Sequence, residues 1–285
     1  MSSCQVINRS ITFDGMVLTD IPLADLSVHR HGPVVTVRLA RPDVLNAFRA
    51  RTRAELASVL RALRADEQAR VVVLTGEGRA FSAGQDLREL GGLLREEDAS
   101  DDRLREGIEE LQELTRALLA LPQVTVAALN GVAVGLGAEL ALACDLRIAA
   151  HSATIGFPEA RRAMFQTNGV MWLLPRIVGL ARAGHLVLTG RLIEAAEAER
   201  IGLVHRACPD AELAPAVEAL AADLAANAPG SLRLAKRLLR DTWGLDLTEV
   251  MARETDGMLA CLRSRDLREG TLAFLEGRTP HYEGR

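Results

Sequence analysis

Two glutamates of this chain lie in apolar stretches of the sequence, where burying a carboxylate is costly unless the group has a function. Glu139 is followed by the apolar run 140–143, and Glu159 follows a Phe-Pro pair. A buried carboxylate has a shifted pKa and is a common proton carrier at catalytic sites. Glu139 could instead be a partly exposed carboxylate that a helix dipole stabilises, and Glu159 a loop carboxylate paired with Arg161 or Arg162. We therefore treat the two glutamates as candidate proton-transfer groups.

A glycine-rich stretch, residues 130–140, leads into Glu139. It follows an apolar strand and opens a predicted helix, whose first N–H groups lack partners within the helix. Gly131, Gly135 and Gly137 keep this helix start open to an anionic oxygen. A dinucleotide-binding loop is the competing interpretation, but the third glycine of that fingerprint is missing.

A second glycine-containing loop, residues 78–87, follows another apolar strand. Ligand sites in α/β sheets open at such places, and Ala83 and Gly84 allow a ligand close to the backbone. Two other interpretations are a tight surface loop and a degenerate nucleophile elbow in which Ser82 is the nucleophile of a serine hydrolase.

Strands alternate with helices in the part of the chain that must position these groups. The pattern predicts a hairpin over 26–39, buried strands over 71–75, 124–129 and 146–149, and a loop over 76–84. Helical periodicity covers 50–65, 101–121 and 138–144, and then 181–188, 193–201, 211–226, 231–241, 247–262 and 266–275. The pattern therefore indicates an α/β fold with a helical C-terminal part. The wide apolar faces of the last helices favour packing on another subunit over a self-packed cap.

The composition excludes several classes of protein. The chain has 285 residues, a net charge of −4 and only 3% aromatic residues, which argues against a nucleic-acid partner. Its four cysteines form no CxxC pair, so we expect neither a disulfide framework nor a zinc site. The same cysteine pattern predicts a location in the reducing cytoplasm. No signal peptide is evident. The stretch 124–144 is long and apolar, but its glycines and Glu139 favour a strand, turn and helix over a membrane span.

Seven motifs, in order along the chain, together resemble the enoyl-CoA hydratase/isomerase (crotonase) superfamily from about residue 25 to the C-terminus. They are Arg41-Pro42 with Leu45-Asn46-Ala47, Phe81-Ser82-Ala83-Gly84-Gln85-Asp86-Leu87, Asn130-Gly131 with Gly135-Leu136-Gly137-Ala138-Glu139-Leu140, Cys144-Asp145, Phe157-Pro158-Glu159, Leu174-Pro175-Arg176-Ile177-Val178-Gly179, and Phe274-Leu275-Glu276-Gly277-Arg278-Thr279-Pro280.

The resemblance implies a crotonase-like spiral of repeated ββα units with a helical trimerisation region. We expect an N-terminal leader over 1–24, the spiral core with the active site over 25–205, and a helical C-terminal region over 206–285. It also implies an acyl-CoA thioester substrate, no cofactor apart from the coenzyme A of that substrate, and assembly as a homotrimer or a hexamer of two trimers.

The resemblance also assigns roles to individual residues. Backbone N–H groups of Gln85 and Leu136 would form the oxyanion hole for the thioester carbonyl, and Glu139 and Glu159 would be the two catalytic glutamates of a hydratase. Coenzyme A would lie along Ala83, Gln85, Leu87 and Arg88, and the acyl and water site would include Gly135, Thr167 and Asn168.

The turn after Glu159 departs from the hydratase pattern. Hydratases typically have a Pro-Gly-x-Gly-Gly turn there, and this chain has Gln166-Thr167-Asn168-Gly169-Val170. The change suggests that the substrate carries a polar acyl group or that the water-binding site is altered. The remaining interpretation is that the change has no functional consequence. We therefore predict an enoyl-CoA hydratase, with Δ3-Δ2 enoyl-CoA isomerisation, C–C bond hydrolysis and non-catalytic acyl-CoA binding as alternatives.

Overall fold

The structure is a computed structural model that describes residues 12–13, 16–17, 23–93 and 100–284. The predicted leader, 1–24, therefore lies mostly outside the described residues. The two short strands that are described there, β1 (Thr12–Phe13) and β2 (Met16–Val17), pair antiparallel.

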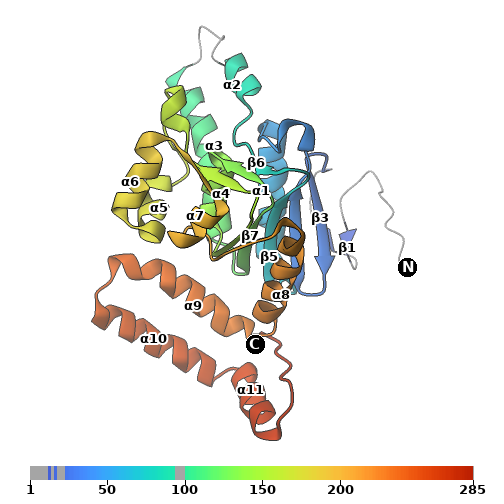
Figure 1. Ribbon diagram of the computed structural model, residues 1–285. Helices are drawn as coiled ribbons and strands as arrows, with labels where there is room; N and C mark the ends of the chain where they lie inside the picture. Colours follow the sequence, from blue (N-terminus) through green and yellow to red (C-terminus); the bar gives the residue numbers. More distant parts are fainter. Residues whose placement is uncertain (1–11, 14–15, 18–22, 94–99, 285) are drawn as a thin grey trace.

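A six-stranded sheet forms the centre of the molecule (Figure 1). The antiparallel hairpin of β3 (Leu26–His31) and β4 (Val34–Leu39) lies at one edge, as predicted. Parallel strands β5 (Val71–Gly76), β7 (Val124–Leu129), β9 (Leu146–Ala150) and β12 (Arg206–Cys208) follow it across the sheet. All side chains of β5 and β7 are buried, because helices cover both faces of the sheet.

A second sheet consists of four three-residue strands. These are β6 (Ala80–Ser82), β8 (Val132–Val134), β10 (Thr154–Gly156) and β11 (Leu192–Glu194), in the order β11-β10-β8-β6. Successive strands along the chain alternate between the two sheets, from β5 to β10, and this alternation is the predicted spiral of ββα units. The expectation of a plain loop over 76–84 and of one helix over 193–201 was wrong, because β6 and β11 occupy parts of these stretches.

Helices fill the space beside both sheets. One core cluster joins the sheets to α1 (Ala50–Ala65), α3 (Asp101–Leu119) and α4 (Leu136–Ala143). A second cluster packs α8 (Leu213–Ala225) on the opposite face of the large sheet. The remaining helices of this body are α2 (Leu87–Leu93), α5 (Val170–Val178), α6 (Leu180–Thr189) and α7 (Ala195–Arg200), with 3₁₀ turns η1 (Pro42–Val44), η2 (Glu159–Arg162) and η3 (Asp210–Glu212). A fourth 3₁₀ turn, η4 (Thr242–Gly244), lies farther along the chain and outside this body.

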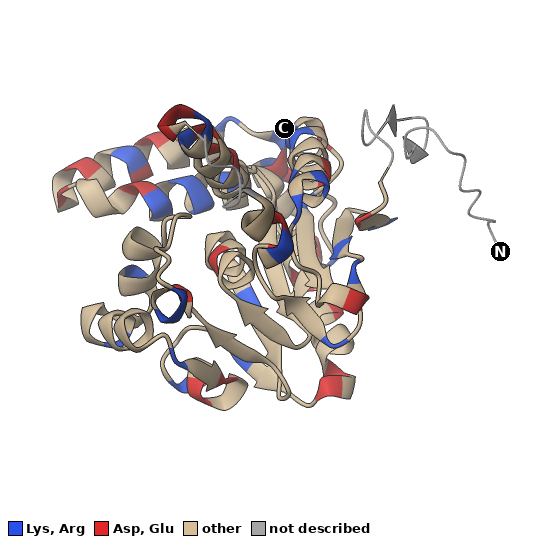
Figure 2. Cartoon of the chain, turned by 90° about the horizontal axis from the view of Figure 1, so that it is seen from above, with Lys and Arg blue, Asp and Glu red and all other residues tan. Residues whose placement is uncertain are grey.

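The last three helices project from this body (Figure 1). They are α9 (Pro229–Asp241), α10 (Leu247–Leu262) and α11 (Arg265–Glu276). Lys236 and Arg240 of α9 contact Asp145 at 2.7 and 2.6 Å and so join α9 to the core. Figure 2 shows both positively and negatively charged residues along the projecting helices. The predicted helical region from residue 206 also includes β12 and α8, which pack with the large sheet.

The apolar stretch 124–144 folds as β7, β8 and α4, which agrees with the predicted strand, turn and helix. Within the described part of the chain, no helix has the length and apolar character needed to cross a membrane.

Candidate active site

All but one of the predicted site residues surround a cavity of about 700 Å³. Its walls come from the loop after β6, from α2 and α3, from the start of α4, and from the segment 158–168. Ala83, Gln85, Leu87, Gly135, Leu136, Glu139, Glu159, Thr167 and Asn168 all line it.

The main chain of Gln85 is oriented by a bridge to Phe48. The Phe48 N–H donates to the Gly84 carbonyl at 2.8 Å, and the Asp86 N–H donates to the Phe48 carbonyl at 2.9 Å. The C=O and N–H of a trans peptide point in opposite directions, so the Gln85 N–H points away from Phe48. The Gln85 N–H has no acceptor among the described residues, and Gln85 lines the cavity.

Leu136 supplies the second free N–H, as the first residue of α4. The first N–H groups of a helix have no acceptor within it, and the helix dipole adds partial positive charge there. Gly84 brings the two donors together: a methyl group on its Cα would lie 3.2 Å from the Leu136 nitrogen and 2.8 Å from the Val134 carbonyl oxygen. Its φ of +86° also favours glycine. Two backbone N–H groups thus border one cavity, and paired donors of this kind can stabilise a negatively charged oxygen.

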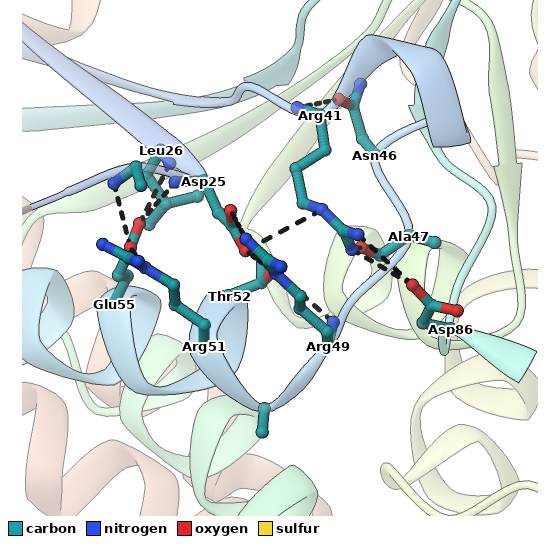
Figure 3. A network of polar contacts seen from close by, with 12 residues as sticks. Asp25, Leu26, Arg41, Asn46, Ala47, Arg49, Arg51, Thr52, Glu55 and Asp86 are labelled. Carbon is teal, nitrogen blue, oxygen red and sulfur yellow. Dashed lines mark hydrogen bonds and ion pairs between the residues drawn. The ribbon is translucent and has the colours of Figure 1, made fainter. Parts of the chain in front are cut away.

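A network of ion pairs holds the segment that carries Gln85 (Figure 3). The Arg41 guanidinium lies 3.3 Å from Asp86, the neighbour of Gln85, and donates to the Ala47 carbonyl. Arg49 forms two hydrogen bonds with Asp25, at 2.8 and 2.6 Å. Burial alone would raise the pKa of Asp25, but the hydrogen bonds from Arg49 and Thr52 hold it below its ordinary value. These pairs join the loop before α1 to the segment that carries Gln85.

The Ser82 side chain supports the backbone of the Gly84 loop. Its side chain is fully buried, its hydroxyl donates to the Asn46 carbonyl at 2.8 Å, and it accepts from the Gly84 N–H at 3.1 Å. It does not line the cavity. The nucleophile-elbow interpretation is therefore wrong, because the hydroxyl is engaged in holding the Gly84 loop.

Glu139 lies in the first turn of α4 and is almost completely buried, with an exposed fraction of 3%. Its Oε2 accepts a hydrogen bond from Asn168 Nδ2 at 2.8 Å, and its Oε1 has no partner among the described residues. Burial, helped by the charge of Glu159 and opposed by Asn168, raises the pKa of Glu139 to about 7. A buried oxygen without a partner is suited to bind a water or a substrate group.

Glu159 is the first residue of η2 and faces the same cavity. Its Oε2 accepts from Gln166 Nε2 at 3.2 Å. A methyl group on Gly135, whose φ is +54°, would lie 3.0 Å from Glu159 Oε1, which places this carboxylate beside the start of α4. Burial raises the pKa of Glu159, although Gln166 and Arg162 oppose the shift. Burial thus raises the pKa of both carboxyl groups above the ordinary value, and the charge of Glu159 adds to the shift at Glu139.

The raised pKa of Glu139 predicts that this residue destabilises the protein at alkaline pH. The folded protein keeps the proton up to about pH 7, whereas the unfolded carboxyl has its ordinary pKa of 4.5, so stability falls as pH rises between these values. We expect Glu139→Gln to raise the free energy of unfolding at pH 8 by up to about 3 kcal/mol, since one pKa unit corresponds to about 1.4 kcal/mol. Urea unfolding at pH 5 and pH 8 measures the difference.

Glu218→Gln is the matched control, because Glu218 is exposed on α8. Its effect on unfolding should be the same at both pH values. An equal effect of Glu139→Gln at both pH values would contradict the assigned pKa shift.

The structure separates Arg88 from the other predicted site residues and adds residues that the sequence did not predict. Arg88 is exposed and does not line the cavity, in contrast to the other predicted positions. The sequence marks Gln166 only as a departure from the hydratase turn, and the structure shows that its side chain contacts Glu159. The apolar side of α3 also closes the cavity, through Leu104, Ile108 and Leu111. The amphipathic pattern of 101–121 indicated a buried face, but not that part of this face borders the site.

No group of three or more His, Cys, Asp or Glu residues arranged to hold a metal ion is found in the described ranges. The cavity brings together two backbone N–H groups without an acceptor among the described residues and two carboxyl groups.

Comparisons with known proteins agree on one family. The family model for enoyl-CoA hydratase/isomerase matches residues 29–285. The chain is 36% identical over 260 residues to 1,2-epoxyphenylacetyl-CoA isomerase of Escherichia coli, covering 90% of this chain and 97% of that protein. It is 35% identical over 257 residues to human enoyl-CoA hydratase domain-containing protein 2, covering 88% and 86%. The crystal structure of an enoyl-CoA hydratase from Bacillus anthracis superposes with a TM-score of 0.87 at 35% identity, covering 92% of this chain and 100% of that one.

Proposed function

The chain belongs to the enoyl-CoA hydratase/isomerase family, and from that premise we propose that it is an enoyl-CoA hydratase that adds water across the double bond of a 2-enoyl-CoA thioester. One observation carries the proposal: two buried glutamates and two free backbone N–H groups line a single cavity. Hydration needs the N–H groups because negative charge develops on the thioester oxygen. It needs the glutamates because one proton leaves the water and another is added to the α carbon.

The proposed reaction begins with water held by the two carboxylates. One ionised glutamate accepts a proton from the water, the hydroxide adds to the β carbon, and the electron pair of the double bond moves to the thioester oxygen. The Gln85 and Leu136 N–H groups stabilise this enolate oxygen, and losing one such donor typically costs ~10²–10³ in rate. A proton from the other carboxyl group then completes the α C–H bond, and the proton taken from the water passes to that group and restores the starting state. The overall change is the addition of one water.

The test is turnover of a panel of acyl-CoA thioesters. Crotonyl-CoA and longer 2-enoyl-CoA esters should lose the absorbance of the conjugated thioester when the enzyme is added, with the 3-hydroxyacyl-CoA as the product. Tight binding of these esters without any product would refute the hydratase and favour a binding protein.

Δ3-Δ2 isomerisation is the second candidate. The observation in its favour is the polar turn, since Gln166 and Asn168 already occupy one oxygen of each glutamate. A 3-enoyl-CoA ester distinguishes the two reactions, because an isomerase increases the absorbance of the conjugated thioester and a hydratase leaves this substrate unchanged. C–C bond hydrolysis would instead release a free carboxylic acid.

We also propose a homotrimer, or a hexamer of two trimers, in the cytoplasm. None of the side chains of α10 is buried, and Met251, Met258 and Leu262 lie exposed at helical spacing. A row of exposed apolar side chains of this kind fits a subunit contact. Cys144, Cys208 and Cys261 are free thiols, which fits a reducing compartment.

We expect light scattering after gel filtration to give three or six times the subunit mass. Leu262→Glu should shift the protein toward the monomer, because it places a charge in the apolar row. Asp256→Asn, on the opposite face of the same helix, is the control and should leave the mass unchanged. A monomer for the unmodified chain would contradict the proposed assembly.

A further inference from the structure

Two buried amides contact the two glutamates, one each. Asn168 Nδ2 donates to Glu139 Oε2 at 2.8 Å, and Gln166 Nε2 donates to Glu159 Oε2 at 3.2 Å. Asn168 is 1% exposed and Gln166 6% exposed. Both belong to the turn that departs from the hydratase pattern, and their polar groups face the carboxylates, which leaves them unsuited to the predicted role of recognising a polar acyl group.

Helix α3 holds this turn in place. The Thr115 hydroxyl lies 3.4 Å from Asn168 Oδ1, so it orients the amide with Nδ2 toward Glu139. Gln112 Nε2 donates to the Thr167 carbonyl at 3.1 Å and so supports the backbone of the turn without contacting either glutamate. The direction of the Asn168 amide thus depends on a buried side chain from a different element.

Both contacts use the Oε2 atom of the glutamate. The remaining atom of Glu139, Oε1, has no partner among the described residues, and Glu159 Oε1 lies beside Gly135 at the start of α4. A carboxylate held at one oxygen by a donor loses rotational freedom, and its other oxygen keeps a fixed direction. Each glutamate therefore presents one defined oxygen to the cavity.

We propose that Gln166 and Asn168 are positioning residues, each of which holds one glutamate through Oε2 and leaves Oε1 to transfer the proton. This inference rests on the paired-glutamate chemistry proposed above. It applies equally to hydration and to isomerisation, since both require a carboxylate aimed at a substrate atom.

Holding Glu139 through Asn168 should affect the pH dependence of the reaction. A hydrogen bond to the ionised form of a carboxylate lowers its pKa, and removing the donor raises it. The charged groups acting on the pair are the other glutamate and Arg162 of η2. Asn168→Leu should therefore move the limb of the pH–rate profile that belongs to Glu139 to higher pH by about one unit. It should lower kcat by at least ~10-fold with little change in KM.

The controls separate positioning from folding. Gln112→Leu loosens the same turn but should leave the pH–rate profile in place. Thr115→Val removes only the hydroxyl that orients Asn168, so it should shift the pH–rate profile in the same direction by a smaller amount. This variant replaces Asn168→Leu in the test if Asn168→Leu does not fold. Gln166→Met is expected to lower kcat less than Asn168→Leu, because its hydrogen bond is longer.

A second readout needs no turnover. Infrared titration of the Glu139 carboxyl, obtained as the difference between the unmodified protein and Glu139→Gln, should show a higher pKa in the Asn168→Leu background. An unshifted titration together with an unshifted pH–rate profile would overturn the positioning role. If instead Glu139→Gln and Glu159→Gln keep full activity, the proposed paired-glutamate function fails, whatever the titration shows.

Discussion

Glu139→Gln and Glu159→Gln should each lower kcat by ~10²-fold or more, because proton transfer by a positioned carboxylate is typically worth ~10²–10⁴ in rate. Glutamine keeps the size and polarity of glutamate but cannot take up a proton at neutral pH. Both side chains line the same cavity as the two free backbone donors. Coenzyme A ester binding should change little, since the oxyanion donors remain.

The measurement is kcat on the best thioester of the panel, together with the dissociation constant of a saturated acyl-CoA that cannot react. Glu89→Gln is the matched control, because Glu89 lines the cavity and is paired with Arg53, away from the proposed proton transfer. Full activity of both the Glu139 and the Glu159 variants would exclude the paired-carboxylate mechanism.

The unmodified enzyme should also have a bell-shaped pH–rate profile, since the proposed mechanism needs one protonated and one ionised carboxyl group. The alkaline limb should lie near pH 7, because burial raises the pKa of Glu139 to about that value and loss of this proton leaves both carboxylates charged.

Gly84→Val should lower kcat/KM by ~10²-fold or more, through loss of oxyanion stabilisation. Any Cβ at this position would lie 2.8 Å from the Val134 carbonyl oxygen and 3.2 Å from the Leu136 nitrogen, and the φ of +86° adds strain. The segments that carry the two N–H donors would have to move apart. A β-branched side chain would also block the approach of the thioester to the backbone.

Gly84→Ala tests the same geometry with a smaller change and should give a smaller loss. Gly107→Ala is the control: Gly107 lines the same cavity, but a methyl group there would meet nothing within 4 Å. Calorimetry with an unreactive acyl-CoA, alongside kcat/KM, shows whether binding is lost with the rate. Normal binding and turnover by Gly84→Val would mean that this loop does not hold the thioester.

The elements with a strong local pattern were predictable from the sequence. The helices 50–65 and 247–262 and the strand 124–129 have the predicted boundaries, because apolar periodicity over many residues is a local property. Three-residue strands such as β6 and β11 have too few residues for any period. Strand β12 exists because it pairs with β9, more than fifty residues away in the chain.

The sequence by itself determined the family and which residues were candidates for the site: the two glutamates, the glycine-containing loops and the backbone donors at Gln85 and Leu136. Only the tertiary structure decided how these groups meet. The pairing of Gln166 with Glu159 and of Asn168 with Glu139, the burial that raises the pKa of Glu139, and the exclusion of Arg88 and Ser82 from the cavity all arise from the packing of separate elements. Such contacts join residues whose distance in the chain bears no relation to their distance in space.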